Sequence, residues 1–328
     1  MSTVGELAGL ANASSTFFLH TMNEVRFITN VDQVERLNDH LVQEGTRTRS
    51  VHGLEVEKTS LQVIQQICQE SAVSFSLIGI DKFLREQPTN GISLLLDADV
   101  EPVVYGNFVC PPIPVDGTEI VTLIQDKFAV YRTMMQARGI LQPRTEIIHN
   151  HHDVEGVLSK IKSERVVIKP RNGGHSSRNV LMLNRSRLED RQEGEIFNFH
   201  DCILQEYAED ALWPPIEWRL HFVGRALCRC LRTTDKNNWS HEFRTSDVDL
   251  DNIPAELEGA AVEASRHLAG ERNRDNFTLD FLQTKNGFVF LEANCGALGS
   301  FYVDSPEKKP FLIPMFQRMF RRYFKKKK

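Results

Sequence analysis

The chain has 328 residues, enough for two domains or one large composite fold, and its 41% hydrophobic and 25% charged residues are typical of a globular protein. This composition excludes wholesale disorder, collagen and coiled coil. The formal net charge of −5 is unevenly distributed, because residues 308–328 hold nine Lys or Arg and no acid. We therefore expect an acidic body, which argues against a nucleic-acid-binding surface, followed by a basic tail.

No run of about 18 apolar residues is present, and no basic stretch precedes an apolar one at the N-terminus. The sequence therefore predicts neither a membrane span nor a secretory signal. Six cysteines are scattered without a C-x-x-C pair, which favours reduced thiols and a cytoplasmic location. Cys228 and Cys230 would share one strand face, but two thiols without a third ligand make a poor zinc site.

Short β-rich segments alternate with helical ones up to about residue 115. Strand composition occurs at residues 25–29, 73–80 and 92–96, and helical spacing at residues 32–43 and 60–69. This alternation is typical of a mostly parallel sheet that is covered by helices. We expect a small α/β domain over residues 1–115.

The pattern changes in the rest of the chain. A helix is predicted from about Thr118 to Ala137, and paired strands are predicted from Arg165 onward. A helix over 254–269 precedes a long hairpin at 277–294. The tail segment places Leu312, Phe316, Met319 and Tyr323 on one helical stripe. Such a stripe fits a helix docked on the body, a homodimer contact, or a helix that lies on an anionic membrane.

A strand that ends in Lys169 is followed by Asn-Gly-Gly-His-Ser-Ser, residues 172–177. Because glycine lets the main chain approach a ligand closely, backbone N–H groups in such a loop can close on phosphate oxygens. Lys169 adds a positive charge beside them. The loop residues concerned are Gly173, Gly174, Ser176 and Ser177. The segment is neither a P-loop nor a Rossmann fingerprint, and alone it also fits a tight hairpin with a surface lysine.

The hairpin at 277–294 indicates a metal site. If residues 285–287 form a three-residue loop, Asp280 lies opposite Glu292 and Asn294 points the same way. With a turn of Asn286 and Gly287 alone, the two carboxylates would lie on opposite faces. The apolar residues favour the three-residue loop, since they then share the other face: Phe277, Leu279, Phe281, Val289, Leu291 and Ala293. Facing carboxylates repel without a cation, and oxygen donors suit Mg²⁺. A solvated strand face is the alternative.

A second hairpin presents charged residues. If Gly224 and Arg225 form a two-residue turn, Glu217 opposes Arg232, and both share a face with Arg219 and His221. Exposed charges on paired strands ordinarily form weak ion pairs. Beside a phosphate site, the arginines can instead hold a transferring phosphoryl group or a substrate carboxylate.

Taken in order, these segments resemble the ATP-grasp family over residues 115–303. The segment Asp-Lys-Phe around Lys127 resembles the first nucleotide lysine of the family, and Val-Val-Ile-Lys-Pro places Lys169 as the second. The loop at 172–177 is similar to the mobile loop over the phosphates, and Leu-Gln-Glu-Tyr is similar to the strand between the two halves. The metal triad of the family matches Asp280, Glu292 and Asn294.

The resemblance implies an ATP-grasp fold, of α/β and α+β class, with an N-terminal α/β domain of the pre-ATP-grasp kind. The expected divisions are residues 1–115, a central and lid subdomain over 116–204, and a C-terminal subdomain with the basic tail over 205–328. ATP would lie between two α+β halves. The implied contacts are Lys127 and Lys169 with the phosphates, Glu206 and Tyr207 with adenine, Glu217 with ribose, and two Mg²⁺ with Asp280, Glu292 and Asn294.

Most members of this family phosphorylate a substrate carboxylate, after which an amine attacks the acyl phosphate to give an amide. The resemblance therefore implies a carboxylate-amine ligase for small-molecule or peptide substrates, with Arg232 and Arg219 as catalytic arginines. Two alternatives stay open. One is an ATP-grasp kinase that phosphorylates a hydroxyl, and the other is a nucleotide-binding regulatory protein without turnover.

Overall fold

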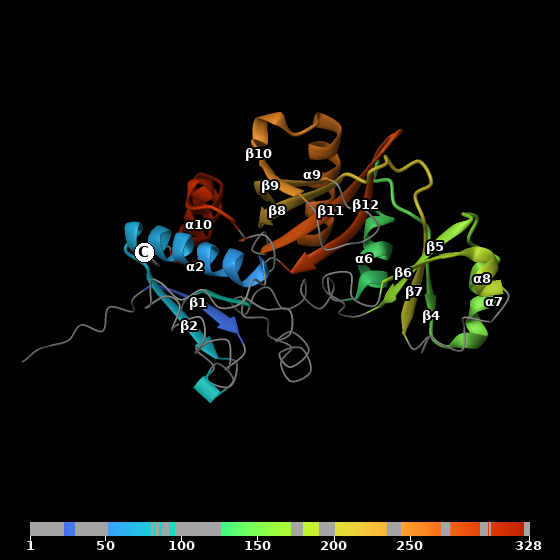
Figure 1. Ribbon diagram of the computed structural model, residues 1–328, viewed down its shortest axis with the longest axis horizontal. Coiled ribbons are helices and arrows are strands. Elements are labelled where there is room, and N and C mark those ends of the chain that lie inside the picture. Colours follow the sequence, from blue (N-terminus) through green and yellow to red (C-terminus); the bar gives the residue numbers. More distant parts are fainter. Residues whose placement is uncertain are drawn as a thin grey trace, which may run out of the picture.

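The computed structural model (Figure 1) consists of three sheets arranged along its long axis, with helices packed beside them. The structure describes residues 23–29, 52–79, 82, 85–86, 92–95, 126–171, 180–189, 201–234, 244–269, 276–295, 301 and 303–324. No helix among these residues is long and apolar enough to cross a membrane.

The N-terminal sheet is parallel, as the alternating pattern predicted. Strand β1 (Glu24–Thr29) lies between β2 (Ser74–Gly79) and β3 (Ile92–Leu95) and pairs in parallel with both. Helix α2 (His52–Glu70) packs beside the sheet and buries Leu61 and Ile64. It extends well beyond the predicted range of 60–69. The helix predicted over 32–43 lies outside the described residues.

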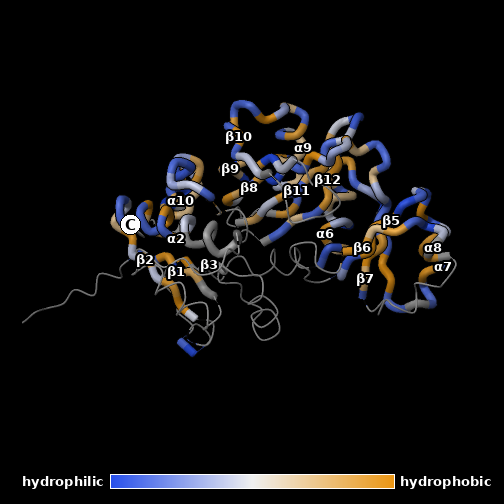
Figure 2. The backbone as a smooth tube through the Cα atoms, viewed as in Figure 1, coloured by the Kyte–Doolittle hydropathy of each residue, from blue (hydrophilic) through white to orange (hydrophobic). Residues whose placement is uncertain are grey.

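A four-stranded antiparallel sheet follows, in the order β4-β7-β5-β6. Its strands are β4 (Thr145–Ile148), β5 (Arg165–Pro170), β6 (Leu181–Asn184) and β7 (Cys202–Glu206). The short helices α7 (Val154–Leu158) and α8 (Arg185–Glu189) cover one face. Apolar residues of these elements form a small core around Ile148, Val166 and Leu204. In Figure 2 the tube around β7 is orange, which marks hydrophobic residues.

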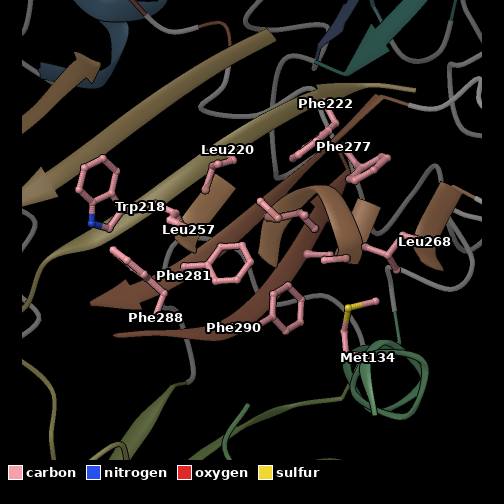
Figure 3. Packing of buried hydrophobic residues seen from close by; sticks show 14 of the residues in the cluster. Met134, Trp218, Leu220, Phe222, Leu257, Leu268, Phe277, Phe281, Phe288 and Phe290 are labelled. Atoms are coloured by element: carbon pink, nitrogen blue, oxygen red, sulfur yellow. The ribbon is translucent and has the colours of Figure 1, made fainter. Parts of the chain in front are cut away.

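A five-stranded antiparallel sheet forms the centre of the molecule, in the order β10-β9-β8-β11-β12. Its strands are β8 (Glu217–Val223), β9 (Ala226–Thr234), β10 (Arg244–Val248), β11 (Asn276–Thr284) and β12 (Gly287–Cys295). Helices α9 (Ala255–Ala269) and α6 (Lys127–Met134) pack on one face. Figure 3 shows the aromatic side chains of β8, β11 and β12 facing Leu257 and Leu268 of α9 and Met134 of α6.

Helix α6 differs from its predicted range at both ends. The periodicity predicted a helix from about Thr118 to Ala137, whereas α6 begins at Lys127 and ends at Met134. Residues 118–125 of the predicted range lie outside the described residues. Asp126 is extended and its side chain accepts hydrogen bonds from the backbone N–H groups of Phe128 and Ala129, at 3.0 and 3.1 Å. A side-chain cap of this kind satisfies N–H groups that have no partner inside the helix.

The β11–β12 hairpin corrects the predicted turn but retains the predicted carboxylate pair. The turn has two residues, 285 and 286, because Thr284 pairs with Gly287. The register then shifts between Asp280 and Phe281, so that Asp280 lies opposite Glu292 after all. Such a bulge adds one residue to one strand. Phe288 and Phe290 therefore face the core, whereas Val289 and Leu291 do not belong to it.

The β8–β9 hairpin has the predicted turn but not the predicted pairing farther along. Val223 pairs with Ala226, as expected for a turn at 224 and 225, and the register shifts between His221 and Phe222. Arg232 consequently pairs with Trp218 rather than with Glu217, and its guanidinium lies 5.5 Å from the centre of the Trp218 ring. Because Trp218 belongs to the core face, Arg232 leaves the face of Glu217 and Arg219.

The basic tail contains helix α10 (Lys309–Tyr323), which lies beside α2 (Figure 1). Leu312, Met315, Phe316 and Met319 are fully buried in a core shared with α2 and the N-terminal sheet. The apolar stripe is therefore docked on the body, which was the first of the three possibilities. Tyr323, the last predicted member of the stripe, has no described side chain.

Candidate nucleotide and metal site

A pocket is lined by residues of the four-stranded sheet, the five-stranded sheet and α6. These elements lie next to one another in Figure 1. Its apolar walls come from α6, β7 and β12. Its polar groups include the two lysines that were predicted to bind phosphate, Lys127 of α6 and Lys169 of β5. Although they are 42 residues apart in the sequence, both reach this pocket. The lining residues are Lys127, Val130, Tyr131, Gln142, Lys169, Ile203, Gln205, Phe290, Leu291, Glu292 and Ala293.

The three predicted metal ligands converge at the β12 side of this pocket. Asn294 donates its side-chain amide to Asp280 Oδ2 at 3.0 Å and to Glu292 Oε1 at 3.2 Å. Asp280 is almost fully buried, and Arg219 donates to both of its oxygens at 2.8 and 2.7 Å. Lys169 Nζ lies 4.0 Å from Glu292 Oε2. Two acids, an amide and two cations thus form one contiguous cluster.

Opposite charges determine the protonation of this cluster. Burial lowers the pKa of Lys169, as does the nearby Lys127, whereas Glu292 opposes both effects. Burial would raise the pKa of Glu292, but the two lysines and the hydrogen bond from Asn294 outweigh it and hold that pKa below its usual range. The charge of Asp280 raises the pKa of Arg219. Glu292 and Arg219 are therefore charged at neutral pH.

The donor set fits Mg²⁺. This ion usually binds one or two carboxylates together with phosphate oxygens, rather than a complete cage of protein ligands. Asp280 and Glu292 supply two carboxylates, and Asn294 supplies a carboxamide. Burial raises the pKa of Asp280, and the charge of Arg219 opposes this effect. When ionised, its carboxylate has about four lone-pair positions, of which Arg219 occupies only part. Over the described residues, no group of three His, Cys, Asp or Glu forms a metal cage.

Glu217 and Arg219 lie on the same face of β8 as the cluster. Arg219 pairs with Asp280 across β8 and β11, and the charge of Glu217 acts on Lys169, Arg219 and Asp280. Arg219 is thus engaged by a predicted metal ligand, a contact that the sequence did not predict. The catalytic role that we propose for Arg219 rests on its place beside Asp280. Arg232 does not share this place, because it pairs with Trp218.

Strand β7 contributes a different residue from those predicted. Glu206 accepts a hydrogen bond from the backbone N–H of Lys162 at 2.7 Å, and Tyr207 lies under the guanidinium of Arg165 at 4.0 Å. Neither lines the pocket, and their contact with adenine stays a prediction. Gln205 lines it instead. The strand register explains the difference, because Ile203 pairs with Lys169 and Gln205 lies on the same face as Ile203.

The predicted phosphate loop begins just after β5. Gly173, Gly174, Ser176 and Ser177 lie outside the described residues, and their role stays a prediction. The residue before the loop, Arg171, binds Asp126 through its guanidinium and accepts a hydrogen bond from the backbone N–H of Lys127 at 3.0 Å. The start of α6 is therefore tied to the end of β5, which fixes the two lysine-bearing elements relative to each other.

Two substitutions of Asp126 separate its roles. Asp126→Asn keeps the helix cap but removes the charge that faces Arg171, so a loss of about 0.5 kcal/mol of unfolding free energy is expected. Asp126→Ala removes both roles and should cost about 1–2 kcal/mol. Urea denaturation measures the difference. Equal stabilities of the two variants would contradict the capping role.

The same aspartate predicts a pH dependence. Burial would raise the pKa of Asp126, but the hydrogen bonds from Arg171, Ala129 and Phe128 outweigh it and lower that pKa. Since the folded pKa is depressed, this contribution is present above the ordinary carboxyl pKa of about 4 and is lost as pH falls through the folded value. Asp126→Asn should remove this part of the acid destabilisation, as measured by denaturation between pH 7 and pH 3.

The fold is the ATP-grasp fold, in which two halves built from sheets and helices enclose a nucleotide pocket. Residues 124–300, more than half of the chain, match the model of the RimK-like ATP-grasp domain, and the chain belongs to this family. No curated protein matches the sequence.

Several solved structures share the fold at low sequence identity. The VanG D-Ala:D-Ser ligase from Enterococcus faecalis is 16% identical with a TM-score of 0.60, covering 92% of this chain and 99% of its own. The D-cycloserine synthetase DcsG is 14% identical with a TM-score of 0.59, covering 90% and 100%. The D-alanine–D-alanine ligase from Bacillus anthracis is 12% identical with a TM-score of 0.54, covering 92% and 99%.

Proposed function

We propose that the protein is an ATP-dependent carboxylate-amine ligase, which joins two substrates through an amide and releases ADP and phosphate. One observation carries this proposal: Lys127, Lys169 and Glu292 line a single pocket, and Asp280 and Asn294 adjoin it through Glu292. These residue types, in a chain of the RimK-like ATP-grasp family, are those needed to bind a nucleotide triphosphate with its metal.

We propose one orientation for ATP in the pocket. The apolar side chains of Val130, Ile203 and Phe290 suit the base, and the two lysines suit the phosphates. Glu217, on the face of the acid cluster, is proposed to accept hydrogen bonds from ribose. The loop at 172–177 follows β5 directly and is proposed to close over the phosphates through its backbone N–H groups.

The proposed reaction has two steps. A carboxylate oxygen of the first substrate attacks the γ-phosphorus of ATP, and the bond from phosphorus to ADP breaks, which gives an acyl phosphate. The amine nitrogen then attacks the carbonyl carbon, the bond to phosphate breaks, and the nitrogen loses a proton. Bound Mg²⁺, proposed as two ions, would neutralise phosphate oxygens during the first step.

The chain itself contributes fixed charge and position. Lys169 is buried, so its ammonium acts on phosphate oxygens with little screening by water. Arg219 is held by Asp280 in a two-point contact, which orients its guanidinium beside the acid cluster. A group fixed before the reaction stabilises developing charge without reorganisation. Arg219 is therefore proposed as the catalytic arginine, and Arg232 is not.

The proposed substrates are a small-molecule or peptide carboxylate and an amine. Two of the structures with this fold are named as ligases of D-alanine with D-alanine or D-serine, which supports this class. A cytoplasmic location, a homodimer and domain boundaries after residues 115 and 204 stay predictions from the sequence.

An ADP-release assay tests the proposal. Purified protein is incubated with ATP, Mg²⁺ and pooled carboxylates, with and without pooled amines. Release of ADP that requires both pools supports the ligase. A phosphorylated product formed without amine would instead indicate a kinase, and tight ATP binding without turnover in any mixture would indicate a regulatory nucleotide-binding protein.

A further inference from the structure

Arg171 connects three of the elements that line the pocket. It follows β5 directly, two residues after Lys169, and its guanidinium donates to Asp126 Oδ2 at 2.5 Å. Both side chains of this ion pair are largely buried. The guanidinium also lies 3.9 Å from Asp201 Oδ1, just before β7. One side chain thus reaches from the end of β5 to the start of α6 and to the start of β7.

The main chain of Arg171 is held by the same neighbours. Its N–H donates to the Asp201 carbonyl at 2.9 Å, and its carbonyl accepts from the N–H of Lys127 at 3.0 Å. Lys127 is the first residue of α6. The position of the first phosphate lysine relative to β5, which bears the second, therefore depends on contacts made by Arg171.

The two lysines need such a connection because their charges repel each other. Burial lowers the pKa of Lys169, and the charge of Lys127 lowers it further. Since Lys169 is buried, water screens this repulsion only weakly. Asp126 and Arg171, which carry opposite charges, flank the two lysines in the sequence. The attraction within this pair draws together the two elements that the lysines push apart.

We propose that Arg171 is a positioning residue, whose ion pair with Asp126 holds Lys127 and Lys169 at the spacing that the phosphates of ATP require. The inference rests on the proposed function, since it requires ATP in this pocket. A site whose groups are in place before binding loses less conformational freedom when the ligand arrives, so its affinity is higher. Arg171 acts through Asp126 and α6, without touching the nucleotide.

Nucleotide binding measured by calorimetry tests the proposal. Arg171→Met is expected to bind ATP about tenfold more weakly than wild-type protein. Adenosine has no phosphates, so it should bind the variant and wild-type protein equally. Arg171→Lys keeps a positive charge that can pair with one oxygen of Asp126, and it should recover most of the affinity for ATP. A matching tenfold loss for adenosine would contradict an effect through the two lysines.

A double-mutant cycle tests whether Arg171 acts through Asp126. Asp126→Asn keeps the cap of α6 but removes the charge that faces Arg171, so it should lose as much affinity for ATP as Arg171→Met. The double variant should lose no more than either single variant, because both changes break the same ion pair. If Arg171 touched a phosphate directly, Asp126→Asn would keep the wild-type affinity, and this result would overturn the positioning role.

Arg144→Met is the matched control. Arg144 precedes β4 of the same sheet and pairs with Glu146 at 3.1 Å, but it does not line the pocket. The control loses a comparable ion pair, which urea denaturation checks, and it should keep the wild-type affinity for ATP. A wild-type affinity in Arg171→Met would overturn the role of Arg171 alone. Failure of wild-type protein to bind ATP would overturn the proposed function together with it.

Discussion

Glu292→Gln is expected to lower ATP turnover by about 10³-fold while the protein stays folded. The substitution keeps an oxygen that can accept from Asn294, at 3.2 Å in the native protein, but removes the negative charge that faces Lys169. One of the two carboxylates of the proposed Mg²⁺ site is lost, so the effect should fall on metal binding and phosphoryl transfer. Steady-state ADP release as a function of Mg²⁺ concentration measures it.

Glu263→Gln is the matched control for this variant. Glu263 lies on α9, away from the pocket, and pairs with Arg266 and His267 at the surface. Loss of such surface pairs has little effect on stability, so turnover should stay at the wild-type level. Circular dichroism serves to check that both variants are folded. A wild-type rate in Glu292→Gln would rule out the metal assignment.

Arg219→Met is expected to destabilise the protein by about 2–3 kcal/mol. The variant leaves the carboxylate of Asp280 buried without its two-point partner, and an unpaired buried charge is strongly destabilising. This loss of unfolding free energy is smaller than the full cost of breaking a buried ion pair, because 35% of the Arg219 side chain is exposed and water screens its charge. Urea denaturation without Mg²⁺ measures the change.

A double mutant separates two effects of Arg219→Met, the loss of the contact with Asp280 and the unpaired charge that is left on Asp280. Arg219→Met combined with Asp280→Asn should be more stable than Arg219→Met alone, since no unpaired carboxylate remains. Millimolar Mg²⁺ should raise the melting temperature of Arg219→Met more than that of wild-type protein, because the ion replaces the missing positive charge. If Arg219→Met were as stable as the wild type in the absence of metal, the pair would have no structural role.

The two hairpins show how far a strand pattern predicts a site. The apolar pattern and an assumed three-residue loop predicted that Asp280, Glu292 and Asn294 share a face, and the structure brings them together. The loop assumed for this result was wrong, and a bulge after Asp280 restored the pairing. In the other hairpin the turn was right, but a similar bulge moved Arg232 to the core face. Bulges have no local composition signal strong enough to predict them.

Strand β7 shows a related limit. The motif Leu-Gln-Glu-Tyr drew attention to Glu206 and Tyr207, yet the pocket receives Gln205. The alternation of side chains was visible in the sequence, but the strand that faces the pocket and its register with β5 were not.

The sequence by itself determined the class of fold and the parallel N-terminal sheet, and it singled out Lys127, Lys169 and the set of Asp280, Glu292 and Asn294, because each depends on residue types at short or regular spacing. The tertiary structure decided which side chains meet. Arg219 binds Asp280, Arg232 faces Trp218, and the tail helix is docked on the N-terminal body. The physical reason is that a one-residue shift in strand register moves every following side chain to the opposite face. Such shifts are set by packing across the sheets, which no local pattern contains.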